Sequence, residues 1–161
     1  MMLEGQVAMA RKQYATAIPV FEKAYQQTAS ATTLVPLFDA YERSGRPRDG
    51  NGLLSAWLER QPQDAGIRSM LAESLMRLGD YKAASEHYLY LNQQAPGNLV
   101  VLNNLAFTLS EIKDRRAIAF AEQALKLKPD SAAVMDTLGW TLVQQGQSAR
   151  GIKLLQQALA T

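Results

Sequence analysis

Small and apolar residues along this chain fall into columns that repeat at intervals of 33 or 34 residues. One column of small residues holds Ala17, Gly50, Ala84, Ala117 and Gly151, and a mostly bulkier column four positions later holds Phe21, Leu54, Tyr88, Ala121 and Leu155. Such a period predicts one pair of amphipathic helices per repeat, because neither helix of a pair can bury its apolar stripe alone. The small residues let the second helix approach the first closely, and the larger ones fill the space between neighbouring pairs.

Turn residues follow the same period. Glycines stand at the predicted turn inside three of the pairs, at Gly45, Gly79 and Gly146. Prolines close three repeats, and each is followed two positions later by a good helix-capping residue: Pro62 with Asp64, Pro96 with Asn98 and Pro129 with Ser131. We therefore expect a single domain of about five units over residues 1–30, 31–64, 65–98, 99–131 and 132–161. The first and last units are expected to be truncated parts of a longer array.

Two residues depart from this pattern. Lys113 stands where the other turns have glycine, and its distance to the next small residue is one position shorter than in the preceding repeat. A non-glycine residue in a left-handed turn costs about 1 kcal/mol, so this turn is expected to be the least regular unless its shortening avoids that conformation. Trp57 occupies the column of Ala24, Ala124 and Ala158. It is expected to pack structurally and to widen the local helix spacing.

The period, the Leu138-Gly139 pair with its relatives Leu71-Ala72 and Leu105-Ala106, and the pairing of Ala17 with Phe21 and of Ala84 with Tyr88 resemble the tetratricopeptide repeat. The resemblance covers essentially the whole chain. It implies an all-α fold, a right-handed superhelical solenoid of antiparallel helix pairs. It also implies a non-enzymatic scaffold whose concave face, lined by the first helix of each pair, holds a peptide or partner segment.

The runs Asn103-Asn-Leu-Ala and Asp136-Thr-Leu-Gly-Trp140 are also similar to the C-terminal repeats of bacterial tetratricopeptide lipoproteins that accompany exopolysaccharide export and the exosortase (PEP-CTERM) system. This second resemblance implies an alternative role, as a structural spacer or oligomerisation element of an envelope assembly. It would place the parent protein facing the periplasm. Without it, a cytoplasmic location fits equally well.

Composition narrows the possible chemistry. The chain has 161 residues, a formal net charge of +2 and no cysteine, which excludes disulfides and thiolate metal sites. No stretch approaches the roughly 18 consecutive apolar residues of a membrane span, so no membrane insertion is expected. The single histidine, His87, has no second histidine or cysteine to join it in a metal or catalytic site. We expect no enzyme activity, no metal and no cofactor, and we interpret the basic turns at 43–48 and 113–116 as solvated rather than as nucleic-acid sites.

The predicted binding surface is the free side of the first helices. Its candidate residues are Asp39, Glu73, Arg77, Asn103, Asn104, Phe107, Asp136 and Trp140. Acidic residues prevail in the N-terminal half of this surface, whereas Phe107 and Trp140 lie one repeat apart in the C-terminal half, near two asparagines. Apolar anchors beside amide groups suit a peptide ligand. The alternative is that both aromatic rings simply pack against the next helix pair.

The surface also indicates which partners to expect. In chaperone-binding tetratricopeptide proteins, lysine and arginine clamp a partner's C-terminal carboxylate, but Ala133 and Thr137 stand at the corresponding positions here. A basic or polar segment with one apolar anchor is therefore the expected ligand. Because Leu154, Leu155 and Leu159 lack the polar capping helix that such arrays need at their ends, self-association through the last helix is also expected.

Overall fold

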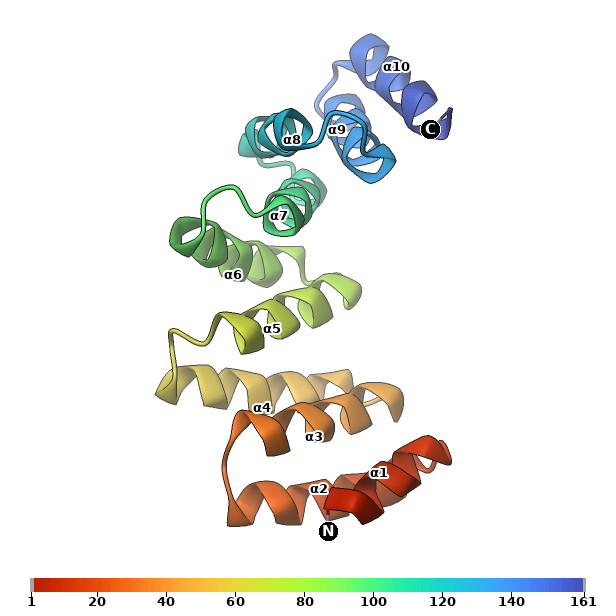
Figure 1. The fold of residues 1–161 in the computed structure, drawn as a ribbon. Coiled ribbons are helices and arrows are strands. Elements are labelled where there is room, and N and C mark those ends of the chain that lie inside the picture. The colour runs from red at the N-terminus through yellow and green to blue at the C-terminus, as the bar shows by residue number, and fades with distance from the viewer. Residues whose placement is uncertain (1, 161) are drawn as a thin grey trace. The chain divides into compact units, whose positions relative to one another are not determined.

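A computed structural model describes residues 2–160 of the chain, and this part contains ten α-helices and no strand. In order, the helices are α1 (Met2–Ala10), α2 (Tyr14–Gln27), α3 (Ala31–Arg43), α4 (Pro47–Arg60), α5 (Ala65–Arg77), α6 (Tyr81–Gln94), α7 (Leu99–Glu111), α8 (Arg116–Leu127), α9 (Ala132–Gln144) and α10 (Ser148–Leu159). Within each unit, successive helices run antiparallel to one another (Figure 1). The all-α class and the arrangement in helix pairs are confirmed.

The helices form two compact units, one that ends at Ser74 within α5 and one that begins at Leu75. In the first unit, α1 packs on α2, α2 on α3 and α3 on α4, around a core that includes Ile18, Phe21 and Leu37. In the second unit, each helix from α6 to α10 packs on the next, and α7 also touches α9. The five-unit division into one domain stays a prediction, and its outermost residues, Met1 and Thr161, lie outside the described range.

The small-residue column marks the closest approach of the two helices in a pair. At α9 and α10, a Cβ added to Gly151 would lie 2.6 Å from the carbonyl oxygen of Gly139, so the two backbones touch there. At α3 and α4, Phe38 faces Gly50, whose added Cβ would lie 3.0 Å from the Phe38 ring. Close helix packing therefore depends on the combined volume of the two facing residues rather than on either one alone.

Every turn inside a pair uses the same backbone hydrogen bonds. In the α7–α8 turn, Lys113 N donates to Ser110 O at 2.9 Å and Asp114 N donates to Leu109 O at 2.8 Å. The same two bonds close the turns at Gly45, Gly79, Gly146 and Lys12. These are the bonds of the Schellman motif, which needs a left-handed residue after the helix.

Lys113 adopts this left-handed conformation with φ +58°, and Lys12 does so with φ +59°. The shortened segment after Lys113 therefore does not avoid the strain. The two bonds that end α7 match those of the glycine turns, but the start of α8 differs from the other second helices, as expected for the least regular turn. Ala117 N donates to Asp114 O, three residues earlier, whereas Ala84 N and Gly151 N donate to carbonyl oxygens four residues earlier. Lys12 is a second non-glycine turn residue that the sequence pattern did not identify.

Trp57 joins the end of α4 to the start of α5. Its indole Nε1 donates to Asp64 Oδ2 at 2.9 Å, and Asp64 Oδ1 accepts from Ile67 N at 3.0 Å in the first turn of α5. Asp64 therefore caps the helix, as predicted, while holding the half-buried tryptophan. Asn98 caps α7 in the predicted way, through bonds from the backbone N–H groups of Val100 and Val101, whereas Ser131 makes no side-chain cap bond.

Candidate partner-binding surfaces

Trp140 lies on α9 in the second unit, and 41% of its surface is exposed. Its indole Nε1 donates a 3.0 Å hydrogen bond to Glu111 Oε1 at the end of α7. The bond satisfies the polar edge of the ring and fixes its orientation, while much of the hydrocarbon face stays accessible. Trp140 therefore differs from a core tryptophan, which would bury most of its surface.

Phe107 lies on α7, one helical turn before Glu111, and therefore on the same side of that helix as the partner of Trp140. Its half-buried ring packs edge-to-face on Tyr81 of α6, with centroids 5.8 Å apart and an interplanar angle of 83°. The two aromatic residues are thus anchored differently. Phe107 packs against another ring, whereas Trp140 donates its indole N–H to a carboxylate.

The predicted polar residues of the second unit have separate roles. Asn104 Nδ2 donates to the hydroxyl oxygen of the buried Tyr88 at 3.1 Å, so Asn104 is used in packing α6 on α7. Asn103 is half-buried, and its buried Oδ1 has no hydrogen-bond partner among the described residues. Asp136 is exposed one turn before Trp140, and Arg77 is exposed at the end of α5. Of these four, Asn103 is the residue with spare hydrogen-bonding capacity in a sheltered position.

The acidic residues predicted in the first unit are partly engaged with their own helices. Asp39 accepts bonds from Arg43 Nε at 2.9 Å and 3.0 Å through both carboxylate oxygens. This contact, and a hydrogen bond to Tyr14, raise the pKa of Arg43 above its ordinary value. Glu73 accepts a 3.3 Å bond from the Ser69 hydroxyl. Arg43 therefore partly neutralises the charge of Asp39, whereas Glu73 keeps its full negative charge beside a neutral hydroxyl.

An apolar pocket of about 430 Å³ opens on the first unit. Its lining residues come from α1, α2, α3 and α5: Gln6, Met9, Phe21, Val35, Pro36, Phe38, Asp39 and Met70. Sequence reasoning included Asp39 but missed the pocket. The available signal was the apolar column of Leu3, Pro36 and Met70, beside Met9, which lies on the free side of the first helices.

Within residues 2–160 there is no group of three or more histidine, cysteine or acidic side chains placed to hold a metal ion. None of the described helices is both long enough and apolar enough to cross a membrane.

Comparison with known proteins agrees with this architecture. Residues 35–98, from α3 to α6, match the sequence model of the family described as Tetratricopeptide repeat. TPR repeat-containing protein PA4667 of Pseudomonas aeruginosa is 33% identical over 107 residues, which cover 63% of this chain. The chain therefore resembles the tetratricopeptide repeat family in both comparisons. It spans only 18% of the length of that relative.

Solved structures of similar fold include several of MamA. The chain superposes on MamA AMB-1 with a TM-score of 0.79 at 20% identity, over 99% of this chain and 88% of that one. MamA RS-1 ArsTM double mutant gives a TM-score of 0.83 at 14% identity, over 97% and 89% of the two chains. At these identities the likeness extends to the fold alone. The resemblance to exosortase-associated lipoproteins stays a prediction.

Proposed function

We propose that this protein is a non-enzymatic scaffold that binds a segment of a partner protein on its first helices. The expected segment is basic or polar and carries an apolar anchor side chain. The observation that carries the proposal is Trp140, an oriented aromatic ring with 41% of its surface exposed. Exposed tryptophans of this kind are the residues that contribute most strongly to protein–protein affinity.

The surroundings of Trp140 suit a peptide. Because Glu111 already holds the indole, little side-chain freedom is lost when a ligand covers the ring. Asp136 precedes Trp140 by one turn and offers a carboxylate to a basic neighbour of the anchor. The buried Oδ1 of Asn103 would pair with a backbone N–H of the ligand only after the half-buried amide turned outward, which would remove the cost of leaving a sheltered polar atom unsatisfied.

The pocket of the first unit is a second contact for the same class of ligand. Met9 and Met70 in its wall are unbranched and adapt to different apolar side chains. Asp39 at the edge of the pocket provides negative charge, which its ion pair with Arg43 partly neutralises. A ligand with apolar and basic residues in alternation would match these features.

The test is peptide selection followed by measured affinity. Peptides selected from a random display library on the wild-type protein should be enriched in lysine or arginine next to a large apolar residue. Trp140→Ala should weaken their binding about tenfold or more, measured by fluorescence anisotropy, with an unchanged unfolding midpoint. The matched control is Leu127→Ala on α8, where a similarly exposed apolar residue (53%) lies on a second helix. Equal affinities of the two variants would refute the proposal.

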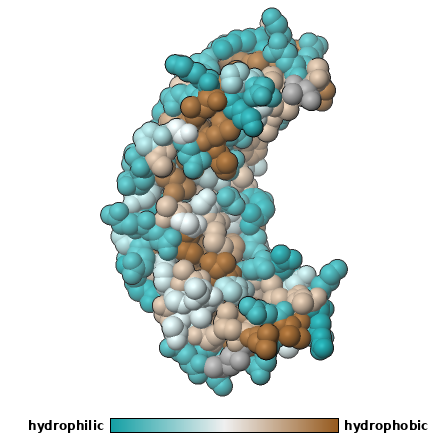
Figure 2. All heavy atoms as spheres, viewed as in Figure 1, coloured by the Kyte–Doolittle hydropathy of each residue, from teal (hydrophilic) through white to brown (hydrophobic). Residues whose placement is uncertain are grey.

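The alternative is a structural spacer that works through end helices. Ile152 and Leu159 of α10 are 50% and 89% exposed, and Leu3 of α1 is 72% exposed. Figure 2 shows apolar atoms at the surface over α1, at the bottom of the view. This role predicts concentration-dependent association, measured by sedimentation velocity. The double substitution Ile152→Ser with Leu159→Ser should abolish the association, and Trp140→Ala should leave it unchanged.

A further inference from the structure

A polar cleft of about 450 Å³ lies in the second unit, between the α7–α8 turn and the α9–α10 turn. It is lined by Lys113, Arg115, Gln144, Gln145 and Gln147. These side chains offer two cations and three amides, and no carboxylate is among them. Trp140 and Phe107 do not line this cleft, although Gln144 lies one helical turn after Trp140 on α9.

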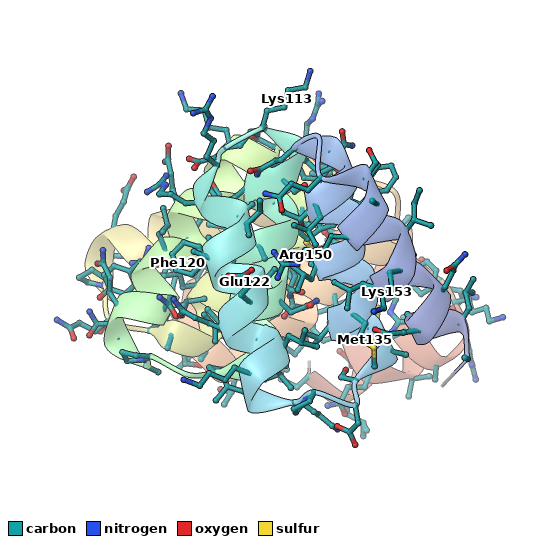
Figure 3. All side chains as sticks on the ribbon, turned by 90° about the horizontal axis from the view of Figure 1, so that it is seen from above. Lys113, Phe120, Glu122, Met135, Arg150 and Lys153 are labelled. Carbon is teal, nitrogen blue, oxygen red and sulfur yellow. The ribbon has the colours of Figure 1, made fainter. Side chains whose placement is uncertain are left out.

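The cleft has a fixed framework. Gln145 Nε2 donates to the backbone carbonyl oxygen of Asp114 at 2.9 Å, which ties the two turns together. Figure 3 shows Lys113 at its turn, with its side chain extending away from the helices. The backbone is therefore held by a hydrogen bond between the turns, while the Lys113 ammonium group can reach a ligand.

Within residues 2–160, the two cations of the cleft have no ion-pair partner. The adjacent carboxylate, Asp114, is engaged by Arg116, whose Nη2 lies 2.7 Å from Asp114 Oδ2. This contact holds the pKa of Asp114 below its ordinary value. Neither Lys113 nor Arg115 forms an ion pair with any of the described residues. Their positive charges are available to an anion.

Lys113 is also held in a strained backbone conformation, at φ +58°, although glycine occupies the same turn position at Gly45, Gly79 and Gly146. Strained non-glycine residues are concentrated at functional sites. Lys12 shares the strain, at φ +59°, in a comparable cleft of the first unit that contains Arg43. There, however, both oxygens of Asp39 bind Arg43, so that cleft has a neutralised arginine.

We propose that the Lys113–Arg115 cleft binds oxyanion groups carried by a protein segment, either phosphorylated side chains or a run of carboxylates. The Arg115 guanidinium can donate two parallel hydrogen bonds to such a group, and the Lys113 ammonium adds a point charge. The glutamine amides supply further N–H donors. This site goes beyond the proposed function, because its ligand has the opposite charge to the one expected at Trp140.

The experiment measures binding of three fluorescein-labelled peptides of equal length by anisotropy at low and moderate salt. One peptide contains phosphoserines, one contains glutamates, and one contains glutamines in their place. Wild-type protein should bind one or both acidic peptides and not the glutamine peptide. Whether the phosphoserine or the glutamate peptide binds more tightly identifies the source of the oxyanion.

Lys113→Gly and Lys12→Gly form a matched pair of variants. Both remove one charge and one strained turn residue, so both should raise the unfolding midpoint by roughly 2–4 °C. Lys113→Gly should weaken binding of the acidic peptide about tenfold, whereas Lys12→Gly should leave it within about twofold of wild type. Arg115→Gln should weaken binding without raising the midpoint.

Three results would overturn the proposal: no binding of either acidic peptide, unchanged affinity in Lys113→Gly, or an equal loss in Lys12→Gly, which would indicate non-specific charge attraction. Trp140→Ala should not change binding of the acidic peptides. The failure of this site and the failure of the Trp140 surface are therefore distinguishable.

Discussion

Both units of this protein contain the same kind of helix pair. They differ in the size of the residues that meet where the two helices come closest. In the first unit, the aromatic ring of Phe38 on α3 packs over Gly50 on α4. In the second unit, Gly139 on α9 faces Gly151 on α10, and backbone meets backbone. In the first contact, a side chain limits how closely the two helices approach, and a side chain can move. The second is limited by a carbonyl oxygen, which cannot move without displacing its helix.

This difference shows that the repeat constrains pairs of positions. Phe38 occupies the place that Ala72, Ala106 and Gly139 hold in later repeats. A large residue is tolerated there because its partner has no side chain. Substitutions that change one member of a facing pair should therefore cost more than substitutions that change both.

The largest expected effect comes from Phe38→Ala. Phe38 is 6% exposed, so its removal leaves a cavity and should lower the free energy of unfolding by about 3 kcal/mol, measured by urea denaturation. Adding Gly50→Ala to this variant should restore about 1 kcal/mol, because alanine refills part of the space and favours the helix. In the wild-type background, Gly50→Ala should not raise the free energy of unfolding, because the Phe38 ring fills the space. Strict additivity of the two changes would show that Phe38 and Gly50 are not coupled.

A smaller loss is expected from Gly151→Ala. The added methyl group would meet the carbonyl oxygen of Gly139 at 2.6 Å, so α9 and α10 must separate, at a net cost of about 2 kcal/mol. Gly52→Ala in α4 is the control, because nothing lies within 4 Å of an added Cβ there. It should raise the free energy of unfolding by about 0.5–1 kcal/mol. Equal effects of both substitutions would contradict the backbone contact.

The smallest effect concerns buried polar groups, in which the units also differ. In the first unit the Tyr41 hydroxyl donates to Glu22 Oε1 at 2.5 Å, whereas in the second unit Tyr88 pairs with the neutral amide of Asn104. Burial, and then the bond to Glu22, raise the pKa of Tyr41 to about 12. Neutral Tyr41 therefore stabilises the fold below pH ~10, and this contribution is lost as the pH rises through the folded pKa.

We expect the free energy of unfolding to fall by about 1 kcal/mol more between pH 10 and 12 in the wild type than in Tyr41→Phe. Denaturant titrations at each pH, followed by circular dichroism, would measure this difference. A pH slope that persists in Tyr41→Phe would assign the alkaline sensitivity to other groups.

Much of the local structure could be predicted from the sequence. The positions of Gly45, Gly79 and Gly146 predicted turns because a left-handed residue is needed there, and each has a positive φ. Lys12 was missed because a lysine carries no turn signal of its own. The capping roles of Asp64 and Asn98 followed from residue type, whereas Ser131, of an equally suitable type, makes no side-chain cap bond.

The binding surfaces were predicted less completely. The helical register placed Trp140 and Phe107 on the first helices, but the exposure of each ring depends on which side chains of neighbouring helices reach it. Glu111 reaches the N–H of Trp140, and Tyr81 covers part of Phe107. The apolar pocket combines residues of four helices, and only the packing of those helices shows that a space remains between them.

The sequence by itself determined the period, the helix pairs and their turns, because these depend on residue size and backbone preference at fixed spacings. The tertiary structure decided which polar groups remain unpaired and which apolar surfaces remain open. Asn103 and Asn104 are neighbours of identical type, yet one bonds to Tyr88 and the other keeps a buried oxygen free of partners in the described chain. Such differences arise from contacts across helices, and a repeat pattern contains no information about them.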